Sequence, residues 1–288
     1  MMTSTPGHSL DAGLAIRDGW RAFLLSPWSF VGFAVVATIL SSLVDLLPGI
    51  AGFLATTLID LWISIGLVRG AWIALDGRKP AFADLAALNG PAIWRLFSSQ
   101  LVLALLLLPI ALIVIGIALT AAEAIQPAAR LLNLSFTSDL SDPQQLNVLI
   151  PGYQTMVMKL MQSPVALIAL LSGWVLGVYV QVNQSFLGFI ALLDGRGPIT
   201  TIRRGFERVK GQWWPVLGLL VLQTIILLIG ILLMVLGLLA AVPLVFCITC
   251  AAYRQLFGSD DRADFLKGRR AARTPPLRSR PAAAEPPG

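Results

Sequence analysis

Few residues in this chain have the type and placement to do chemistry, and Asp60 is the sharpest of them. It lies near the middle of the apolar stretch 50–75. A carboxylate there costs roughly 2.5–3.5 kcal/mol if the stretch crosses a bilayer. Arg69 falls on the opposite face of a helix and is no obvious partner. We expect Asp60 to face the interior of a helix bundle or to be protonated. It is then either an ion- or substrate-binding residue of a transporter, or a structural Asp that is buried and hydrogen-bonded or lies at the outer interface.

A second polar group lies in the apolar stretch 164–193. Five of the seven residues from 179 to 185 are polar, among them Gln181, Asn183 and Gln184. Such side chains line a polar cavity in some membrane proteins, and in most they hydrogen-bond to a neighbouring helix. The sequence favours the second use and leaves the first open, in which Asp60 and this cluster form a site at the midplane.

Metal, cofactor and catalytic sites have little basis in these residues. The one histidine is His8, and the two cysteines, Cys247 and Cys250, lie in an apolar stretch without further ligands, so we interpret them as small helix-packing residues. Paired carboxylates, a glycine-rich phosphate loop and a nucleophile elbow are all missing from the sequence. The basic C-terminal tail has no interleaved aromatic residues. The sequence therefore predicts no metal, no cofactor, no nucleic-acid partner and no enzymatic activity.

Composition identifies the elements that hold these residues. Apolar residues make up 57% of the 288 residues and charged residues 12%, with a mean hydropathy of +0.80. A soluble domain of this size has too little interior for so much apolar surface, so the excess must face lipid. We expect an all-α, polytopic membrane helical bundle.

The apolar stretches give the number of spans. They cover residues 28–47, 50–75, 96–119, 164–193 and 214–253. One span needs roughly 20 apolar residues. The last stretch would be about 60 Å long as a single helix, so we expect it to fold back between Gly237 and Pro243. The sequence thus predicts six transmembrane helices.

Charge gives the orientation. With six spans, 18 of the 21 basic residues fall on one side, and the loop 120–163 on the other side carries only Arg130 and Lys159. This is the distribution that the positive-inside rule requires for a multi-pass protein of the cytoplasmic (inner) membrane with both termini in the cytoplasm. The segments 1–9 and 259–288 are expected to be disordered.

An internal repeat divides the chain. Residues 15–40 align without a gap to residues 201–226 with eight identities in 26 positions, and each copy begins with a basic amphipathic helix suited to the membrane interface. The sequence LDGRKP at 75–80 also matches LDGRGP at 193–198. We therefore expect three units of one interfacial helix plus two spans, at 10–75, 80–193 and 198–258. The middle unit has its surface helix at 81–88 and the loop 120–163 as an insertion.

The repeated segments also supply candidate contacts to lipid head groups. These are Arg17, Arg203 and Arg204 on the amphipathic helices and Arg78 and Arg196 in the turns. Each arginine near an anionic leaflet contributes about 1 kcal/mol to membrane attraction. The alternative is that these charges only fix the topology.

The motif R-x-G-[WF], at 17–20 and 203–206, leads each time into a span. With the six-span pattern it resembles the YciC-like bacterial inner-membrane proteins and the membrane domain beside some glycerophosphodiester phosphodiesterases. The resemblance implies a fold and a membrane, and no phosphodiesterase domain is present. We expect a non-enzymatic membrane-organising or accessory protein that binds the bilayer, anionic phospholipids, a membrane protein partner or a second copy of itself. A transporter of a small solute or lipid is the alternative, and a membrane enzyme acting on lipid head groups a weaker one.

Overall fold

The computed structural model describes residues 10–47, 49–137, 143–195, 197–258, 260–263 and 265. The regular elements in these ranges are all helices, as the composition predicts. In chain order they are α1 (Ala12–Leu25), α2 (Pro27–Val44), α3 (Gly49–Leu75), α4 (Phe82–Leu85), α5 (Gly90–Ala121), α6 (Ile125–Thr137), α7 (Pro143–Gln162), α8 (Pro164–Gln184), α9 (Leu187–Leu193), α10 (Pro198–Val209), η1 (Lys210–Gln212), α11 (Trp213–Leu232) and α12 (Met234–Phe257).

Six helical stretches in the described part of the chain are long and apolar enough to cross a membrane, which confirms the predicted number. They are Pro27–Val44, Gly49–Leu75, Gly90–Ala121, Pro164–Leu193, Pro198–Leu232 and Gly237–Phe257. The fourth stretch combines α8 and α9, and the fifth combines α10, η1 and α11.

The turn between the last two spans lies earlier than we expected. The chain reverses at Leu233 and Met234, where Met234 adopts a left-handed φ of 59°. Gly230 and Gly237 permit the close approach, since a methyl group at Gly230 would lie 2.8 Å from Cβ of Ala241. Pro243 lies inside α12. The prediction of a turn between Gly237 and Pro243 is therefore wrong, because a membrane helix tolerates an internal proline when neighbouring helices surround it.

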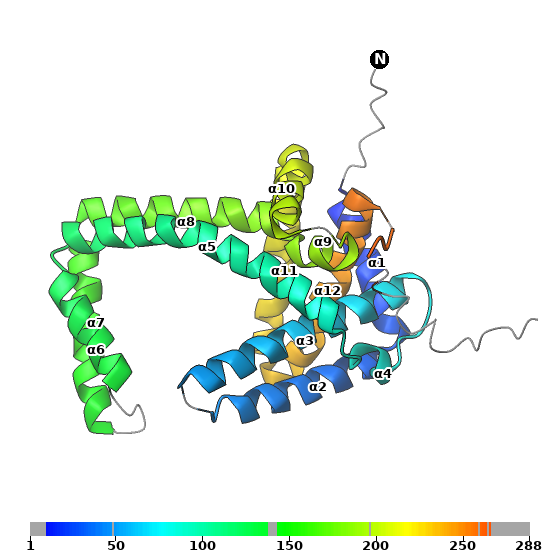
Figure 1. Ribbon diagram of the computed structural model, residues 1–288, viewed down its shortest axis with the longest axis horizontal. Coiled ribbons are helices and arrows are strands. Elements are labelled where there is room, and N and C mark those ends of the chain that lie inside the picture. The colour runs from blue at the N-terminus through cyan, green and yellow to red at the C-terminus, as the bar shows by residue number, and fades with distance from the viewer. Residues whose placement is uncertain are drawn as a thin grey trace, which may run out of the picture.

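The helices form a compact group of helices and one long arm (Figure 1). α5 and α8 run side by side away from the rest of the molecule, and α6 and α7 fold across their far end. Only 6% of the most apolar part of α5 is buried, whereas half of that part of α12 is. The region 120–163, which we expected to be a loop, contains the helices α6 and α7, and these two helices pack on one another.

The core lies where α3, α9 and α12 meet, around Tyr253. Its ring stacks on Phe257 with centroids 4.7 Å apart and on Phe189 at 5.6 Å, and Trp72 of α3 lies at 6.1 Å. Aromatic pairs at such distances contribute about 0.5–1.5 kcal/mol each beyond the area they bury. This cluster joins the ends of three helices that are far apart in the chain.

Short helices pack across these ends. α1 lies on α12, α10 lies on α5, α8 and α9, and α4 lies on α3. The α1 contact is close, since a methyl group at Gly19 would lie 2.6 Å from Cα of Ile248. The surface helix that we expected at 81–88 is helical only over Phe82–Leu85. The chain beyond it is held to α3 by side chains, because Trp62 Nε1 donates to the Ala86 carbonyl at 3.1 Å and Arg69 donates to that of Ala87 at 2.9 Å.

The first residues after α12 are ordered against this core. Ala263 N donates to the Leu193 carbonyl at 3.0 Å, and Phe265 is 2% exposed. The guanidinium of Arg69 lies 4.8 Å from the Phe265 ring centroid. The expected disorder from 259 onward therefore does not apply to these residues, because a single large apolar side chain finds a buried position. The rest of the predicted tail, and the leader 1–9, lie outside the described residues.

Candidate functional site

Asp60, the first candidate from the sequence, does not face the interior of the bundle. The residue is exposed on α3, and no hydrogen bond or ion pair joins it to another described residue. The buried stripe of α3 begins one residue later and runs through Leu61, Ile65 and Trp72. Hydropathy could not show which face of α3 carries Asp60, because α3 has apolar residues on all sides.

The polar cluster on α8 holds helices together. Gln184 is buried, and its Nε2 donates to the Ile202 carbonyl of α10 at 3.1 Å. Asn183 Nδ2 donates to the Tyr179 carbonyl of its own helix at 2.7 Å, and Gln181 is exposed. The helix is interrupted directly after Gln184. An interruption frees backbone polar groups inside an apolar stretch, and nearby polar side chains satisfy such groups. Among the described contacts, none joins this cluster to Asp60, so one midplane site built from both finds no support.

The two cysteines are buried and free. Cys247 and Cys250 lie on α12 on either side of Ile248, where α1 makes its closest approach. Within the described residues, no group of three or more His, Cys, Asp and Glu side chains could hold a metal ion.

The two LDGR turns are fixed by ion pairs that no short-range pattern shows. In the first, Asp76 Oδ1 accepts from Arg254 Nη2 of α12 at 2.7 Å, and Arg78 lies 3.3 Å from the other oxygen. In the second, the Asp194 carboxylate, only 4% exposed, accepts from Arg204 of α10, and Arg262 lies 3.6 Å from it. Each aspartate thus connects the end of one span to a segment from elsewhere in the chain.

Every span that returns to this end of the molecule stops at a glycine with positive φ. Gly77 has φ 73°, Gly195 has φ 67°, and Gly258, after α12, has φ 89°. This left-handed conformation is the usual helix C-terminal signal and favours glycine. The third turn has a weaker sequence signal, because Leu256-Phe257-Gly258 keeps the Leu-x-Gly of the other two turns but lacks their Asp and Arg.

The five arginines predicted to contact lipid differ in their exposure and in their ion pairs. Arg204 is committed to Asp194, whereas Arg17 and Arg78 are exposed and lie near Asp18 and Asp76 respectively. Arg203 is exposed and lies 2.7 Å from Glu207, one helical turn away. Arg196 lies outside the described residues. Three of the predicted cations are therefore exposed at the end of the molecule where the turns gather.

Two further exposed cations on this end, Arg208 and Lys210, make no hydrogen bond or ion pair with a described residue. They follow Arg203 and Arg204 along α10 and η1. The apolar side of α10 packs on protein, since Ile202 and Val209 are buried. The charged side faces outward and is available to a ligand.

Comparison of the chain with protein-family models, with curated proteins and with solved structures finds no match.

Proposed function

We propose that this protein is a non-enzymatic, multi-pass component of the cytoplasmic membrane that organises lipid or assists a membrane partner through its basic end. The observation that carries the proposal is the exposed row of Arg203, Arg208 and Lys210 on α10 and η1. Its cations point away from the protein at one end of a six-span bundle. A cation at an anionic leaflet contributes about 1 kcal/mol. Arg208 and Lys210 have no described partner and Arg203 has only the exposed Glu207, so the row as a whole favours anionic lipid.

The exposed side of α1 supports the same placement. Trp20 and Leu24 are about half exposed, Trp28 at the start of α2 is 85% exposed, and Arg17 and Arg21 lie next to them. Exposed aromatic and aliphatic side chains beside arginines are typical of the boundary between acyl chains and head groups. The basic end then lies at the cytoplasmic leaflet, with both termini in the cytoplasm.

We also propose that the bundle consists of three related units. The contacts supply the support: α1 packs on α12, α4 on α3, and α10 on α8 and α9. α1 and α4 therefore lie on the second span of the unit before them, with the first unit lying on the last, and α10 lies on both spans of the middle unit, since it also contacts α5. The glycines of the two aligned copies make comparable contacts, since a methyl group at Gly205 would lie 2.9 Å from the Asn183 carbonyl.

The test of lipid binding compares two sets of neutralised cations. The variant Arg203→Gln/Arg208→Gln/Lys210→Gln removes the exposed row and leaves the Arg204–Asp194 pair in place. The matched control, Arg130→Gln/Lys159→Gln, removes the two cations near α6 and α7. After mild purification, mass spectrometry of bound phospholipid is expected to show several-fold less anionic lipid on the first variant and no change on the control. Equal retention by the wild type and both variants would contradict the proposal.

A further inference from the structure

An open cavity lies between α1, the end of α3 and α12, at the same end of the molecule as the basic row. Its volume is about 490 Å³, within the range of about 300–1,000 Å³ usual for small-molecule sites. Three side chains on its wall carry charge and the floor is apolar. The lining residues are Asp18, Arg21, Ala22, Leu25, Ala74, Leu75, Gly77, Ala251, Arg254 and Gln255.

One of the two arginines is already fixed and neutralised. Arg254 donates to the Asp76 carboxylate at 2.7 Å and to the Trp72 carbonyl at 3.1 Å. Its guanidinium also lies 4.2 Å from the Trp72 ring centroid. These contacts make Arg254 a rigid part of the wall, and its charge is largely balanced by that of Asp76.

The remaining two charges are opposite in sign and available. Arg21 makes no hydrogen bond or ion pair with a described residue. Asp18 is paired only loosely, with Arg17 at 3.8 Å and with both side chains about half exposed. Such exposed pairs contribute little. Asp18 and Arg21 are three residues apart on α1, so their Cβ atoms are about 5–6 Å apart on one face.

Neutral donors and apolar contacts complete the wall. Gln255 Oε1 accepts from the backbone N–H of Asp11 at 2.9 Å, which fixes the amide and leaves its NH₂ group without a described acceptor. The floor consists of small or aliphatic side chains, among them Ala22, Leu25 and Ala251. A ligand that fits has a negative group, a positive group a short distance away, and an apolar continuation.

We propose that this cavity binds the head group of a phosphoethanolamine lipid, with its phosphate on Arg21 and its ammonium group on Asp18. The two-carbon linker between phosphate and amine matches one helical turn between the two side chains, and the start of the acyl chains lies along Leu25. This assignment rests on the proposed function, which places this end of the molecule at the level of the head groups.

Charge balance favours a zwitterion over an anionic lipid. With Arg254 balanced by Asp76, the free charges of the wall are one guanidinium and one carboxylate. A purely anionic head group would place negative charge beside Asp18. A choline head group keeps the ammonium charge, but its methyl groups remove the N–H donors that form charge-assisted hydrogen bonds to a carboxylate.

The direct test is native mass spectrometry of the full-length protein titrated with phosphatidylethanolamine or phosphatidylcholine of identical acyl chains. The wild type is expected to bind the ethanolamine lipid more tightly. Arg21→Gln should weaken binding of both lipids roughly tenfold, as expected for loss of one charge-assisted hydrogen bond. Asp18→Asn should abolish the preference for ethanolamine lipid, because it weakens the binding of ethanolamine lipid more than that of choline lipid. Both positions are on the surface of α1, so the variants are expected to unfold at the wild-type temperature.

The control is Lys79→Gln, which removes another exposed cation at this end of the molecule that is not part of the cavity wall and should change neither affinity. Equal affinities of the wild type for the two lipids would overturn the proposal, as would equal effects of Lys79→Gln and Arg21→Gln. Neither result bears on the row at Arg203, Arg208 and Lys210, whose test uses anionic lipid. The failure of this proposal is therefore distinguishable from failure of the proposed function.

A soluble compound of the same chemistry separates a lipid from a free metabolite. Glycerophosphoethanolamine has the same phosphate and amine but no acyl chains. It is expected to bind at least tenfold more weakly than the lipid, because it gains nothing from the apolar floor or from the membrane around it. Equal or tighter binding of the soluble compound would overturn the assignment to a lipid.

Discussion

Arg254 and Asp76 are 178 residues apart in the chain, and Nη2 of the arginine lies 2.7 Å from Oδ1 of the aspartate. The pair joins the end of α12 to the end of α3, beside the aromatic cluster and the cavity. It therefore holds together the first and last thirds of the chain at the end of the molecule that we place in the cytoplasm.

This pair is expected to contribute a modest but measurable coupling energy. The Arg254 side chain is 19% exposed and that of Asp76 37%, so solvent screens part of the attraction. A double-mutant cycle with Asp76→Asn and Arg254→Gln should give a coupling of roughly 1 kcal/mol in the free energy of unfolding in detergent. Additive effects of the two substitutions would show that the contact does not stabilise the protein.

Asp194 should contribute more to the free energy of unfolding than Asp76. Its carboxylate is 4% exposed and receives Arg204 and Arg262. A fully buried pair costs about 3–5 kcal/mol to break, and partial exposure of the two arginines reduces this, so Asp194→Asn should lower the free energy of unfolding by roughly 2 kcal/mol. Asp260→Asn is the control, because Asp260 is exposed and lies 3.6 Å from the same Arg262. A cost for Asp194→Asn no larger than that of the control would contradict this prediction.

The aligned repeats contain two pairs of equivalent glycines, and substitution by alanine is expected to destabilise the protein at one pair and not at the other. A methyl group at Gly19 would lie 2.6 Å from the backbone of Ile248, and one at Gly205 would lie 2.9 Å from the Asn183 carbonyl. Ala at either position should cost about 1–3 kcal/mol, with Gly19 the more sensitive because its contacts are shorter. At Gly32 and Gly218 no atom lies within 4 Å of the added methyl group. Gly→Ala there should be neutral or slightly stabilising in the same unfolding assay. Equal costs at all four positions would show that these helices do not pack as described.

Burial of Phe265 should protect the segment after α12 from cleavage by trypsin. The side chain is buried, and the segment makes one backbone hydrogen bond to Leu193. Phe265→Ala removes the apolar contact, so trypsin should cleave after Arg262 several-fold faster than in the wild type. Cleavage after Arg78, exposed in the turn after α3, provides the internal reference and should keep its rate. An unchanged rate at Arg262 would show that Phe265 does not hold the segment.

The sequence predicted the number of spans because length and hydropathy alone determine which stretches can cross a bilayer. It misplaced the last turn, since the signal that it used, Pro243, is compatible with the interior of a membrane helix. It also could not orient Asp60, because α3 is apolar on most sides and no periodicity distinguishes the face that packs from the face that meets lipid.

Only those features of the site that are formed by residues close together in the chain were predictable from the sequence. The repeated LDGR motifs correctly marked two turns, and the basic character of α10 could be read directly. The partners of Asp76 and Asp194 could not, because Arg254 and Arg262 approach them only after the bundle has assembled. The cavity on α1 was missed for the same reason. Its wall combines residues from three helices, and Asp18 and Arg21 alone look like an ordinary exposed helical face.

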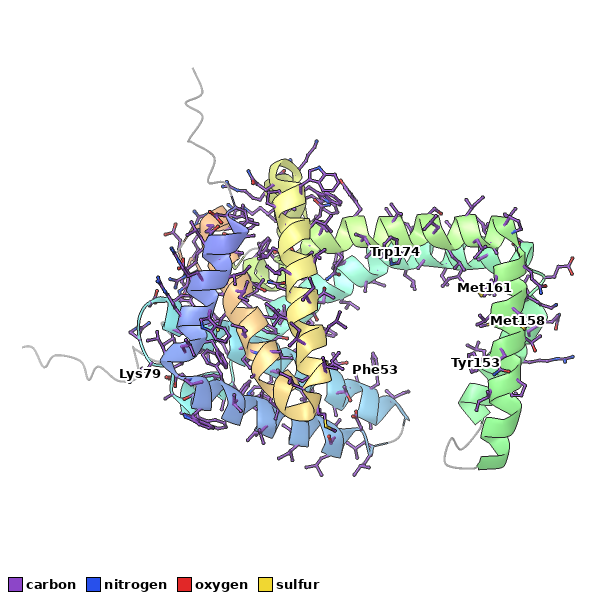
Figure 2. The ribbon with its side chains drawn as sticks, turned by 180° about the vertical axis from the view of Figure 1, so that it is seen from behind. Phe53, Lys79, Tyr153, Met158, Met161 and Trp174 are labelled. Atoms are coloured by element: carbon purple, nitrogen blue, oxygen red, sulfur yellow. The ribbon has the colours of Figure 1, made fainter. Side chains whose placement is uncertain are left out.

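In the proposed orientation, the basic end of a six-span bundle faces the cytoplasm and the α6–α7 end faces the opposite side. Figure 2 shows Lys79 at one end of the molecule and Tyr153, Met158 and Met161 at the other. The native cysteines are buried, so a new surface cysteine can be labelled selectively. The decisive measurement is labelling of Met158→Cys and Lys79→Cys in intact bacterial spheroplasts with a membrane-impermeant maleimide. We predict that Met158→Cys reacts in intact spheroplasts and Lys79→Cys only after they are permeabilised. Reaction of Lys79→Cys before permeabilisation would contradict the account.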